Sequence, residues 1–301
     1  MRGKTRRDEI VGEYRREQIT AIALIIATVV LVLSMMISCG RSCTCGEEAD
    51  EPYVPPEGVV VWDKEEAEAI KEWWEEEEKL NAPREAPVLN AEDIGYLRSV
   101  TEYPRLINKE NPLPTGYEPP ELVRLQGMPG GVKQQLNYEA ANAFFALRDA
   151  MLAEGMSVDP LSGYRTYDEQ ANIYNYNIDL RIEKGMTPEE ARDAVSTRVA
   201  MPGYSEHQYG RSIDVTIDGS TDDLFHETAQ GQWIAENAHK YGFIIRYLRG
   251  ATDVTGYDYE PWHLRWVGVE HAEFIHRHNL CLEEYIDLVL QYNPNAVMRY
   301  E

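Results

Sequence analysis

The sequence predicts an α+β domain in which helices pack on a small antiparallel sheet. Two stretches, residues 136–155 and 168–185, have helical character, and each ends at a glycine that can stop a helix. Residues 211–217, RSIDVTI, instead alternate polar and apolar side chains with β-branched residues, which is typical of a strand. Helical segments that precede short strands, instead of alternating with them, favour the α+β class.

The elements follow in chain order. Residues 106–125 contain four prolines and are expected to form an extended arm instead of a helix. A third helix is expected to open at the Thr-Pro pair 187–188, and residues 243–248 and 264–268 are further strand candidates. The first helix carries an apolar stripe that is expected to face the core: Leu136, Ala140, Ala143, Phe144, Leu147 and Met151.

Residues 19–38 have no ionisable side chain, and twenty such residues can cross a bilayer as a helix. Six basic residues precede this run, so residues 1–18 are expected to be a cytoplasmic basic segment and residues 19–38 a transmembrane helix. The rest of the chain would then be extracytoplasmic. The length of the run favours this anchor over a cleaved signal peptide. A lipoprotein anchored at Cys39 is the second alternative, because residues 36–39 loosely resemble a lipobox.

Charge is distributed unevenly along the 301 residues. The formal net charge is −23, with +3 on residues 1–45 and −26 on the remainder, which argues against a nucleic-acid-binding protein. Residues 39–95 are rich in Glu and Pro and are expected to be an acidic spacer, which leaves residues 96–301 for the globular domain. Three cysteines cluster within residues 39–45 and Cys281 lies far away, so no disulfide framework is expected.

Four residues form a candidate metal site. His207 and Asp214 lie seven positions apart at the entrance to a predicted strand, with Gly210 between them to let the backbone bend. His263 would complete three ligands of types that zinc accepts, with the fourth position left for water. Glu260, three residues before His263, is the expected catalytic base. The remaining histidines are expected to be surface residues: His226, His239, His271, His276 and His278.

Three motifs resemble the signature blocks of the VanY-type D-alanyl-D-alanine carboxypeptidases, which are zinc peptidases of the LAS superfamily. They are SGYRTYDEQ at 162–170, SEHQYGRSIDV at 205–215 and YEPWHLRWVG at 259–268, and they occur in the family's order. The segment NKENPLPTGYEPPELV at 108–123 is similar to the N-terminal arm of the family. The resemblance covers roughly residues 103–290 and implies a LAS/hedgehog-like peptidase fold whose sheet carries a zinc site.

The resemblance implies the same metal ligands, His207, Asp214 and His263, and the same base, Glu260. It also implies that Arg165 grips the terminal carboxylate of a peptide, which a guanidinium fork does bidentately. Gln170 would assist in binding and Ser205 would add a hydrogen bond to the substrate. Ser212 departs from the family, whose members mostly have alanine there. The interval between Gln170 and His207 is somewhat long, which leaves the width of the cleft open.

These residues lead to a functional expectation. The chain is expected to be a monomeric zinc D,D-carboxypeptidase that removes the C-terminal D-alanine from peptidoglycan stem peptides outside the cytoplasmic membrane. An L,D-carboxypeptidase or a wall endopeptidase of the same fold remains an alternative, because the motifs do not separate these activities. A non-catalytic wall-binding module would be expected to lack Glu260 or a ligand, and none is missing. A membrane-anchored scaffold that acts through the acidic spacer is a further alternative, and only the composition of the spacer supports it.

Overall fold

The computed structural model describes residues 84–299 except 128, 129, 132 and 222, together with residues 68, 71, 72, 75, 79 and 82. The chain divides into two compact units, Met1–Leu80 and Asn81–Glu301. The predicted cytoplasmic segment 1–18, the predicted transmembrane helix 19–38 and most of the predicted spacer lie outside the described residues. Within the described part, helices that are both long enough and apolar enough to span a membrane are absent.

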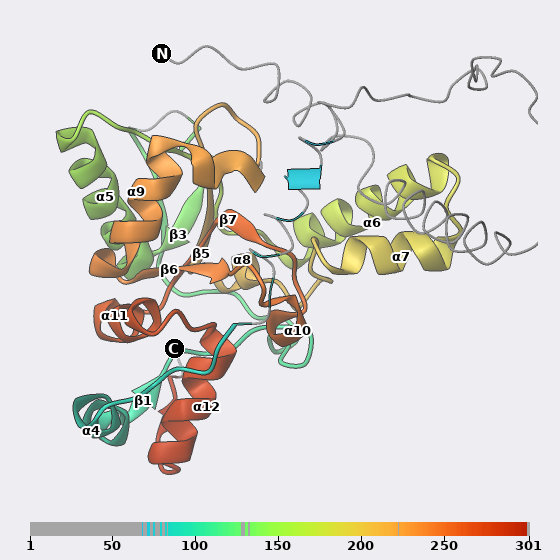
Figure 1. The fold of residues 1–301 in the computed structure, drawn as a ribbon. Coiled ribbons are helices and arrows are strands. Elements are labelled where there is room, and N and C mark those ends of the chain that lie inside the picture. Colours follow the sequence, from blue (N-terminus) through green and yellow to red (C-terminus); the bar gives the residue numbers. More distant parts are fainter. Residues whose placement is uncertain are drawn as a thin grey trace, which may run out of the picture. The chain divides into compact units, whose positions relative to one another are not determined.

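The second unit is built on a four-stranded sheet in the order β4-β5-β7-β6, and Figure 1 labels its strands β5, β6 and β7. The strands are β4 (Asp159–Ser162), β5 (Ser212–Thr216), β6 (Phe243–Tyr247) and β7 (Glu260–Trp266). Every neighbouring pair is antiparallel, which confirms the predicted small antiparallel sheet and two of its strands.

The third predicted strand, residues 264–268, was placed too late, because β7 begins at Glu260. The proline at position 261 lies opposite a shift in the register of β6 and β7, between Ile245 and Tyr247. An irregular pairing of this kind accepts a residue without a backbone N–H, which a regular central ladder would not. As a result, the strand includes both Glu260 and His263.

The largest apolar core lies between the sheet and the helices α5 (Tyr138–Ala153) and α9 (Ala229–Asn237). The side chain of Asn137 caps α5 by accepting a hydrogen bond from the backbone N–H of Glu139. Leu136 precedes that cap and belongs to β3 (Gln135–Asn137), so it is not on the helix as predicted. Strand β3 pairs with β2 (Leu122–Arg124), which ends the proline-rich arm. The arm contains no helix, as expected.

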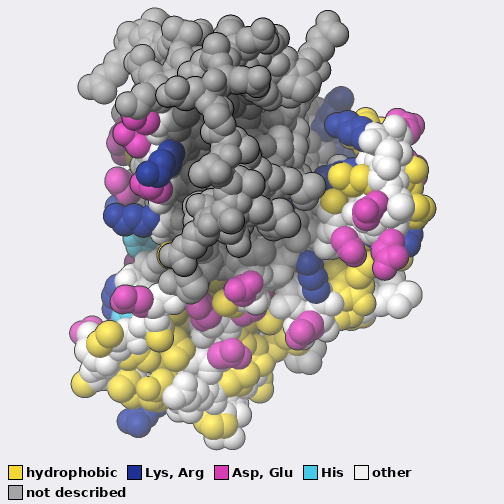
Figure 2. Space-filling view, turned by 45° about the vertical axis from the view of Figure 1, so that its right-hand side comes forward, with side chains coloured by type: hydrophobic (Ala, Val, Ile, Leu, Met, Phe, Trp, Pro, Cys, Tyr) yellow, Lys and Arg dark blue, Asp and Glu magenta, His cyan; other side chains and the backbone are white. Residues whose placement is uncertain are grey.

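Helices α6 (Tyr167–Glu183) and α7 (Pro188–Ser196) pack side by side at one edge of the unit (Figure 1). Each starts with a capping box, Thr166 with Glu169 and Thr187 with Glu190, as the sequence pattern Thr-x-x-Glu predicts. Figure 2 shows hydrophobic and charged side chains mixed on the surface of this lobe, at the right of the view. One face of α6, with Gln170, Ile173, Asn177 and Arg181, lines the cavity described below.

A second core joins three helices: α4 (Ala91–Ser99), α11 (Val269–Arg277) and α12 (Leu282–Tyr292). Two short strands, β1 (Glu102–Tyr103) and β8 (Val297–Met298), pair in parallel beside it. Helix α4 crosses the predicted boundary between spacer and domain at residues 95 and 96. The compact unit Asn81–Glu301 includes α4, which buries Leu97 against α12, and Arg84 pairs with Glu284 at 2.9 Å.

Short elements complete the unit: α8 (Glu206–Tyr209), α10 (Thr252–Thr255) and the 3-10 helices η1 (Asp223–Glu227) and η2 (Ala238–Tyr241). One histidine predicted at the surface, His271, is instead buried between helices, and a second, His278, is partly buried. His271 is 9% exposed and its Nδ1 lies 2.6 Å from the hydroxyl of Tyr285. His278 Nε2 lies 3.0 Å from Asp93 Oδ1, which joins α11 to α4.

Candidate active site

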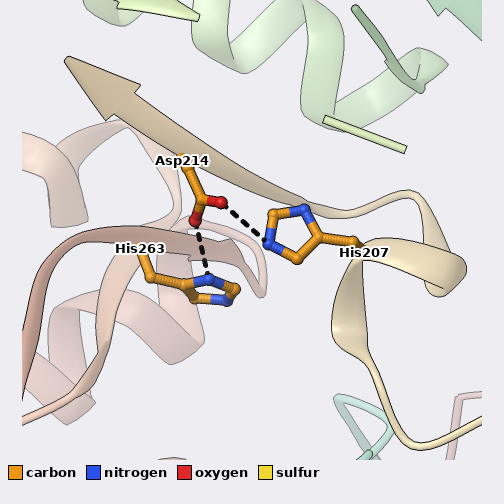
Figure 3. A group of neighbouring side chains, drawn as sticks. All are labelled: His207, Asp214 and His263. Carbon is orange, nitrogen blue, oxygen red and sulfur yellow. Dashed lines mark hydrogen bonds and ion pairs between the residues drawn. The ribbon is translucent and has the colours of Figure 1, made fainter. Parts of the chain in front are cut away.

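Three side chains from separate segments of the chain converge beside the central strands of the sheet: His207, Asp214 and His263 (Figure 3). One ligand atom from each lies within 4.8 Å of the others, and all three residues are buried. The two oxygens of Asp214 face different rings, with Oδ2 3.3 Å from His207 Nε2 and Oδ1 2.9 Å from His263 Nδ1. Among the described residues this is the one cluster of His, Cys, Asp and Glu suited to a metal ion.

The sheet places two of these side chains together. Asp214 of β5 and His263 of β7 are direct partners across an antiparallel pair. Side chains at such positions leave the same face of the sheet about 5 Å apart. The other neighbour of Asp214 is Ser162 on β4, so the carboxylate lies on a central strand with a strand on each side.

The third side chain comes from α8. This one-turn helix begins at its N-cap Ser205, whose hydroxyl accepts the backbone N–H of His207, and ends at Gly210 in the left-handed conformation, with φ 76°. A Cβ at position 210 would lie 3.1 Å from atoms of Pro119 in the arm, so both backbone angle and space favour glycine. The turn delivers His207 to the start of β5, as its spacing from Asp214 predicts.

The two histidines present opposite ring nitrogens to the site. His207 Nδ1 lies 2.8 Å from the carbonyl oxygen of Gly163 and donates its proton there, which leaves Nε2 as the electron-pair donor. His263 instead turns Nδ1 toward Asp214 and Nε2 toward Glu206, whose Oε2 is 3.5 Å away. Nε2 of His207 is buried and has no hydrogen-bond partner among the described residues.

These donors fit zinc. Two imidazole nitrogens and one carboxylate oxygen are a ligand set that zinc accepts in catalytic sites, where the fourth position stays open. Burying a hydrogen-bond acceptor without a partner costs free energy. A metal ion bound to Nε2 of His207 would supply the partner that this buried nitrogen lacks among the described residues. The predicted zinc site therefore agrees with the geometry of these three residues.

Electrostatics keep two of the three ligands, His207 and Asp214, in forms that suit a cation. Burial lowers the pKa of His207 to about 4, so this ring is neutral near pH 7. Burial raises the pKa of the Asp214 carboxyl, but His207 and His263 outweigh it and hold the pKa well below its usual range. Burial also lowers the pKa of His263, but hydrogen bonds to Asp214 and Glu206 raise it to about 9, so a metal ion would displace a proton there.

Glu260 is placed and tuned as a base. It precedes His263 on β7, and its Oε2 lies 3.9 Å from His263 Nδ1. Burial raises the pKa of Glu260 to about 8, although the positive charges of His263, Arg198 and Arg165 pull it down. A carboxyl group whose pKa lies near neutrality can both accept and return a proton.

Arg165 lies on the other side of Asp214. Its Nη2 is 3.6 Å from Asp214 Oδ2, and its backbone N–H donates to the carbonyl of His207 at 3.2 Å. Arg165 follows the end of β4 by three residues, so the strand next to β5 brings the guanidinium to the site. The structure thus places the predicted carboxylate-binding group directly beside the predicted metal ligands.

Gln170 and Ser205 line the same cavity, which has a volume of about 290 Å³. The Nε2 of Gln170 donates to the carbonyl of Ala200 at 2.7 Å, whereas its Oε1 is buried without a partner among the described residues. The Ser205 hydroxyl already caps α8, so the structure gives it a local role as well as a place in the cavity. All seven residues predicted for the site line this one cavity: Arg165, Gln170, Ser205, His207, Asp214, Glu260 and His263.

Sequence reasoning missed other residues of the cavity. Tyr247 and Tyr257 line it, and burial raises the pKa of both phenols, so they are neutral donors at neutral pH. Glu206 is fully buried beside His263. The sequence did contain a signal for Glu206, because this carboxylate directly precedes the predicted metal ligand His207. A charged residue in that position indicates a role in the site and not in a solvated turn. Nothing in the local sequence indicated Tyr247.

Comparison with known proteins agrees with this site. Residues 133–269 match the family described as "VanY: D-alanyl-D-alanine carboxypeptidase". The chain belongs to this family. The putative carboxypeptidase YodJ of Bacillus subtilis (strain 168) is 40% identical over 61% of this chain and 67% of its own length. A D-alanyl-D-alanine carboxypeptidase of Enterococcus faecalis (strain ATCC 700802 / V583) is 36% identical over 60% of this chain. The chain spans 65% of that relative's length.

Solved structures of the family have the same fold. A mutant of the vancomycin resistance D,D-pentapeptidase VanY in complex with Zn(II) is 38% identical, with a TM-score of 0.53 over 60% of this chain and 97% of the other. VanYB in complex with D-alanine-D-alanine is 37% identical, with a TM-score of 0.54 over 61% and 96%. The LdcB LD-carboxypeptidase is 39% identical, with a TM-score of 0.53 over 60% and 84%. The predicted LAS-type peptidase fold of helices and sheet is confirmed.

Proposed function

We propose that this chain is a zinc-dependent D-alanyl-D-alanine carboxypeptidase that removes the C-terminal D-alanine from peptidoglycan stem peptides. One observation carries the proposal: Arg165 Nη2 and His207 Nε2 lie 3.6 Å and 3.3 Å from the same oxygen of Asp214. One residue extends a peptide by only about 3.8 Å. A carboxylate-binding arginine this close to the metal ligands favours release of a single terminal residue.

The chain's own groups divide the work of hydrolysis. Arg165 binds the terminal carboxylate and so selects the end of a peptide. Glu260 accepts a proton from the attacking water at its carboxylate and returns it to the leaving amine. The buried phenol of Tyr257, which has no hydrogen-bond partner among the described residues, is available to bind the substrate. Zinc held by His207, Asp214 and His263 supplies a Lewis acid and positive charge for the developing oxyanion.

A second specificity has an observation in its favour. The LdcB LD-carboxypeptidase is about as similar to this chain as the VanY structures are, with 39% identity and a TM-score of 0.53 against 37–38% and 0.53–0.54. A tetrapeptide that ends in one D-alanine also presents a terminal carboxylate to Arg165. The D,D assignment is preferred because the family match and the enterococcal relative both carry that description.

Mass spectrometry separates the two specificities. The zinc-loaded chain is incubated with a pentapeptide stem that ends in D-Ala-D-Ala and, separately, with the tetrapeptide. Loss of one alanine from the pentapeptide alone supports the D,D assignment. Loss from the tetrapeptide moves the assignment to the L,D class, and no cleavage of either peptide by a chain shown to bind zinc contradicts both.

We further propose that residues 19–38 anchor a monomeric enzyme in the cytoplasmic membrane with the catalytic domain outside. The support is the uncharged run of twenty residues and the basic residues before it. Protease added to spheroplasts is expected to degrade the domain. A Cys39→Ser variant should stay in the membrane fraction, whereas its release would favour the lipoprotein anchor. Sedimentation of the detergent-solubilised chain tests the monomer.

A further inference from the structure

A cluster of four charged side chains, three of them buried and one partly buried, lies behind the metal ligands. We call it the Glu206 cluster, and it consists of Glu206, Arg246, Arg265 and Glu283. Arg246 Nε and Arg265 Nη1 each lie 2.8 Å from the same oxygen, Oε1 of Glu206. Arg246 also binds Glu283 with both of its terminal nitrogens, at 2.8 and 2.7 Å. Two negative and two positive charges balance, as buried ions require.

The cluster reaches the candidate metal site through the other oxygen of Glu206. Oε2 accepts the hydroxyl of Ser212 at 3.1 Å and lies 3.5 Å from Nε2 of His263. That nitrogen is buried and has no hydrogen-bond partner in the described part of the chain, so the Glu206 carboxylate is the acceptor nearest to hand. The opposite nitrogen of the ring, Nδ1, faces Asp214 at 2.9 Å. The imidazole of His263 thus stands between the Glu206 carboxylate and the metal-ligand face.

We propose that Glu206 is a positioning residue: it accepts the Nε2–H of His263 and so directs the Nδ1 electron pair toward the metal. The inference rests on the proposed zinc site. A neutral imidazole has one N–H, and an acceptor on one side decides which nitrogen remains free to bind a metal. His207 uses the neutral carbonyl of Gly163 for this purpose. His263 uses a carboxylate, and the two arginines keep that carboxylate in place.

The cluster also connects the site to the C-terminal helix. Glu283 lies in the first turn of α12, outside residues 133–269 that match the family. Its bidentate contact holds the Arg246 guanidinium, which in turn holds Oε1 of Glu206. Helix α12 therefore contributes to the orientation of a metal ligand that it does not touch.

The isosteric change Glu206→Gln tests the role of this oxygen. Both arginines place a cationic nitrogen 2.8 Å from Oε1, so a glutamine must keep its carbonyl oxygen there and turn its NH₂ toward His263 Nε2. A donor then faces a donor. Zinc affinity of the full-length chain, measured by competition with a chelator, is expected to fall by about 10- to 100-fold. Ser212→Ala is the matched control, because it perturbs the same contact but keeps the carboxylate, and its zinc affinity should stay within about twofold of wild type.

Two further measurements do not depend on that variant folding. In nitrogen-15 spectra of the zinc-loaded wild type, His263 should carry its proton on Nε2 and His207 on Nδ1. The reverse pattern for His263 overturns the proposal. Glu283→Gln should weaken zinc binding by about threefold or more, because it weakens the hold on Arg246, which in turn holds the Glu206 carboxylate.

Equal zinc affinity in Glu206→Gln and wild type, or an equal loss in Ser212→Ala, also overturns the proposal. Neither zinc affinity nor the ring spectra involve peptide cleavage. Failure of the positioning role is therefore distinguishable from failure of the proposed function, which the peptide assay tests.

Discussion

Oε2 of Glu260 lies 3.9 Å from Nδ1 of His263, and both residues belong to strand β7. The irregular pairing of β6 and β7 next to Pro261 allows a base and a metal ligand three residues apart to face one cavity. In a regular strand, side chains three apart leave opposite faces of the sheet. The Glu-Pro-Trp-His motif therefore supplies the base and the metal ligand, and its proline occurs where the strand pairing becomes irregular enough for both to face the cavity.

The Glu260→Gln variant should bind zinc normally and lose hydrolysis by roughly 100- to 10,000-fold, because the amide cannot accept a proton. The measurement is kcat on the D-Ala-D-Ala pentapeptide, with zinc content by elemental analysis as the control. Turnover close to wild type would remove Glu260 from its assigned role.

Arg165→Lys keeps the positive charge beside Asp214 but removes the guanidinium fork. We expect KM for peptides with a free terminal carboxylate to rise by about 10-fold or more, with a smaller effect on kcat. The comparison substrate is the same peptide with an amidated C-terminus. If the wild type cleaves the amidated peptide equally well, the arginine does not select the carboxylate.

Gly163→Ala should destabilise the domain and weaken zinc binding. A Cβ at this position would lie 2.4 Å from the carbonyl oxygen of Gln135, so the strand must move, and with it the carbonyl that orients His207. The expected cost is about 1–3 kcal/mol of unfolding free energy. Gly95→Ala in α4 is the control, since its Cβ meets nothing within 4 Å and a helix interior prefers alanine. A destabilised Gly95→Ala together with a neutral Gly163→Ala would contradict this account.

Stability should fall as the pH is lowered from 8 to 5, in part through His271. Burial lowers the pKa of His271 from its ordinary value of 6.5 to about 4, so the folded state prefers the neutral ring. The unfolded chain binds a proton below about pH 6.5 and the folded chain does so only near pH 4, so stability is lost between these values.

His271→Gln, which does not titrate, should reduce the loss of unfolding free energy between pH 8 and 5 by roughly 2 kcal/mol. Urea titrations of the zinc-loaded protein at the two pH values measure it. An equal pH dependence in variant and wild type would show that His271 titrates normally.

Much of the site was predictable because its residues lie in short motifs. His207 and Asp214 are joined by one turn and one strand, and Glu260 and His263 share a strand, so local spacing carried the information. The predicted helices were also found near their expected positions, because capping residues such as Thr166 and Thr187 mark where helices start. The burial of His271 was missed, since it depends on the hydroxyl of Tyr285 from another helix.

The sequence by itself determined which chemical groups the site contains: two imidazoles, two carboxylates and a guanidinium, each in a recognisable motif. Only the tertiary structure decided how the two rings are turned. A neutral imidazole carries its one proton on either of two nitrogens, and the neighbour packed against the ring decides which one. For His207 that neighbour is the carbonyl of Gly163, and for His263 it is Glu206, held by arginines at positions 246 and 265. These contacts join residues that are far apart in the sequence, so they form only when the chain folds and local sequence patterns do not reveal them.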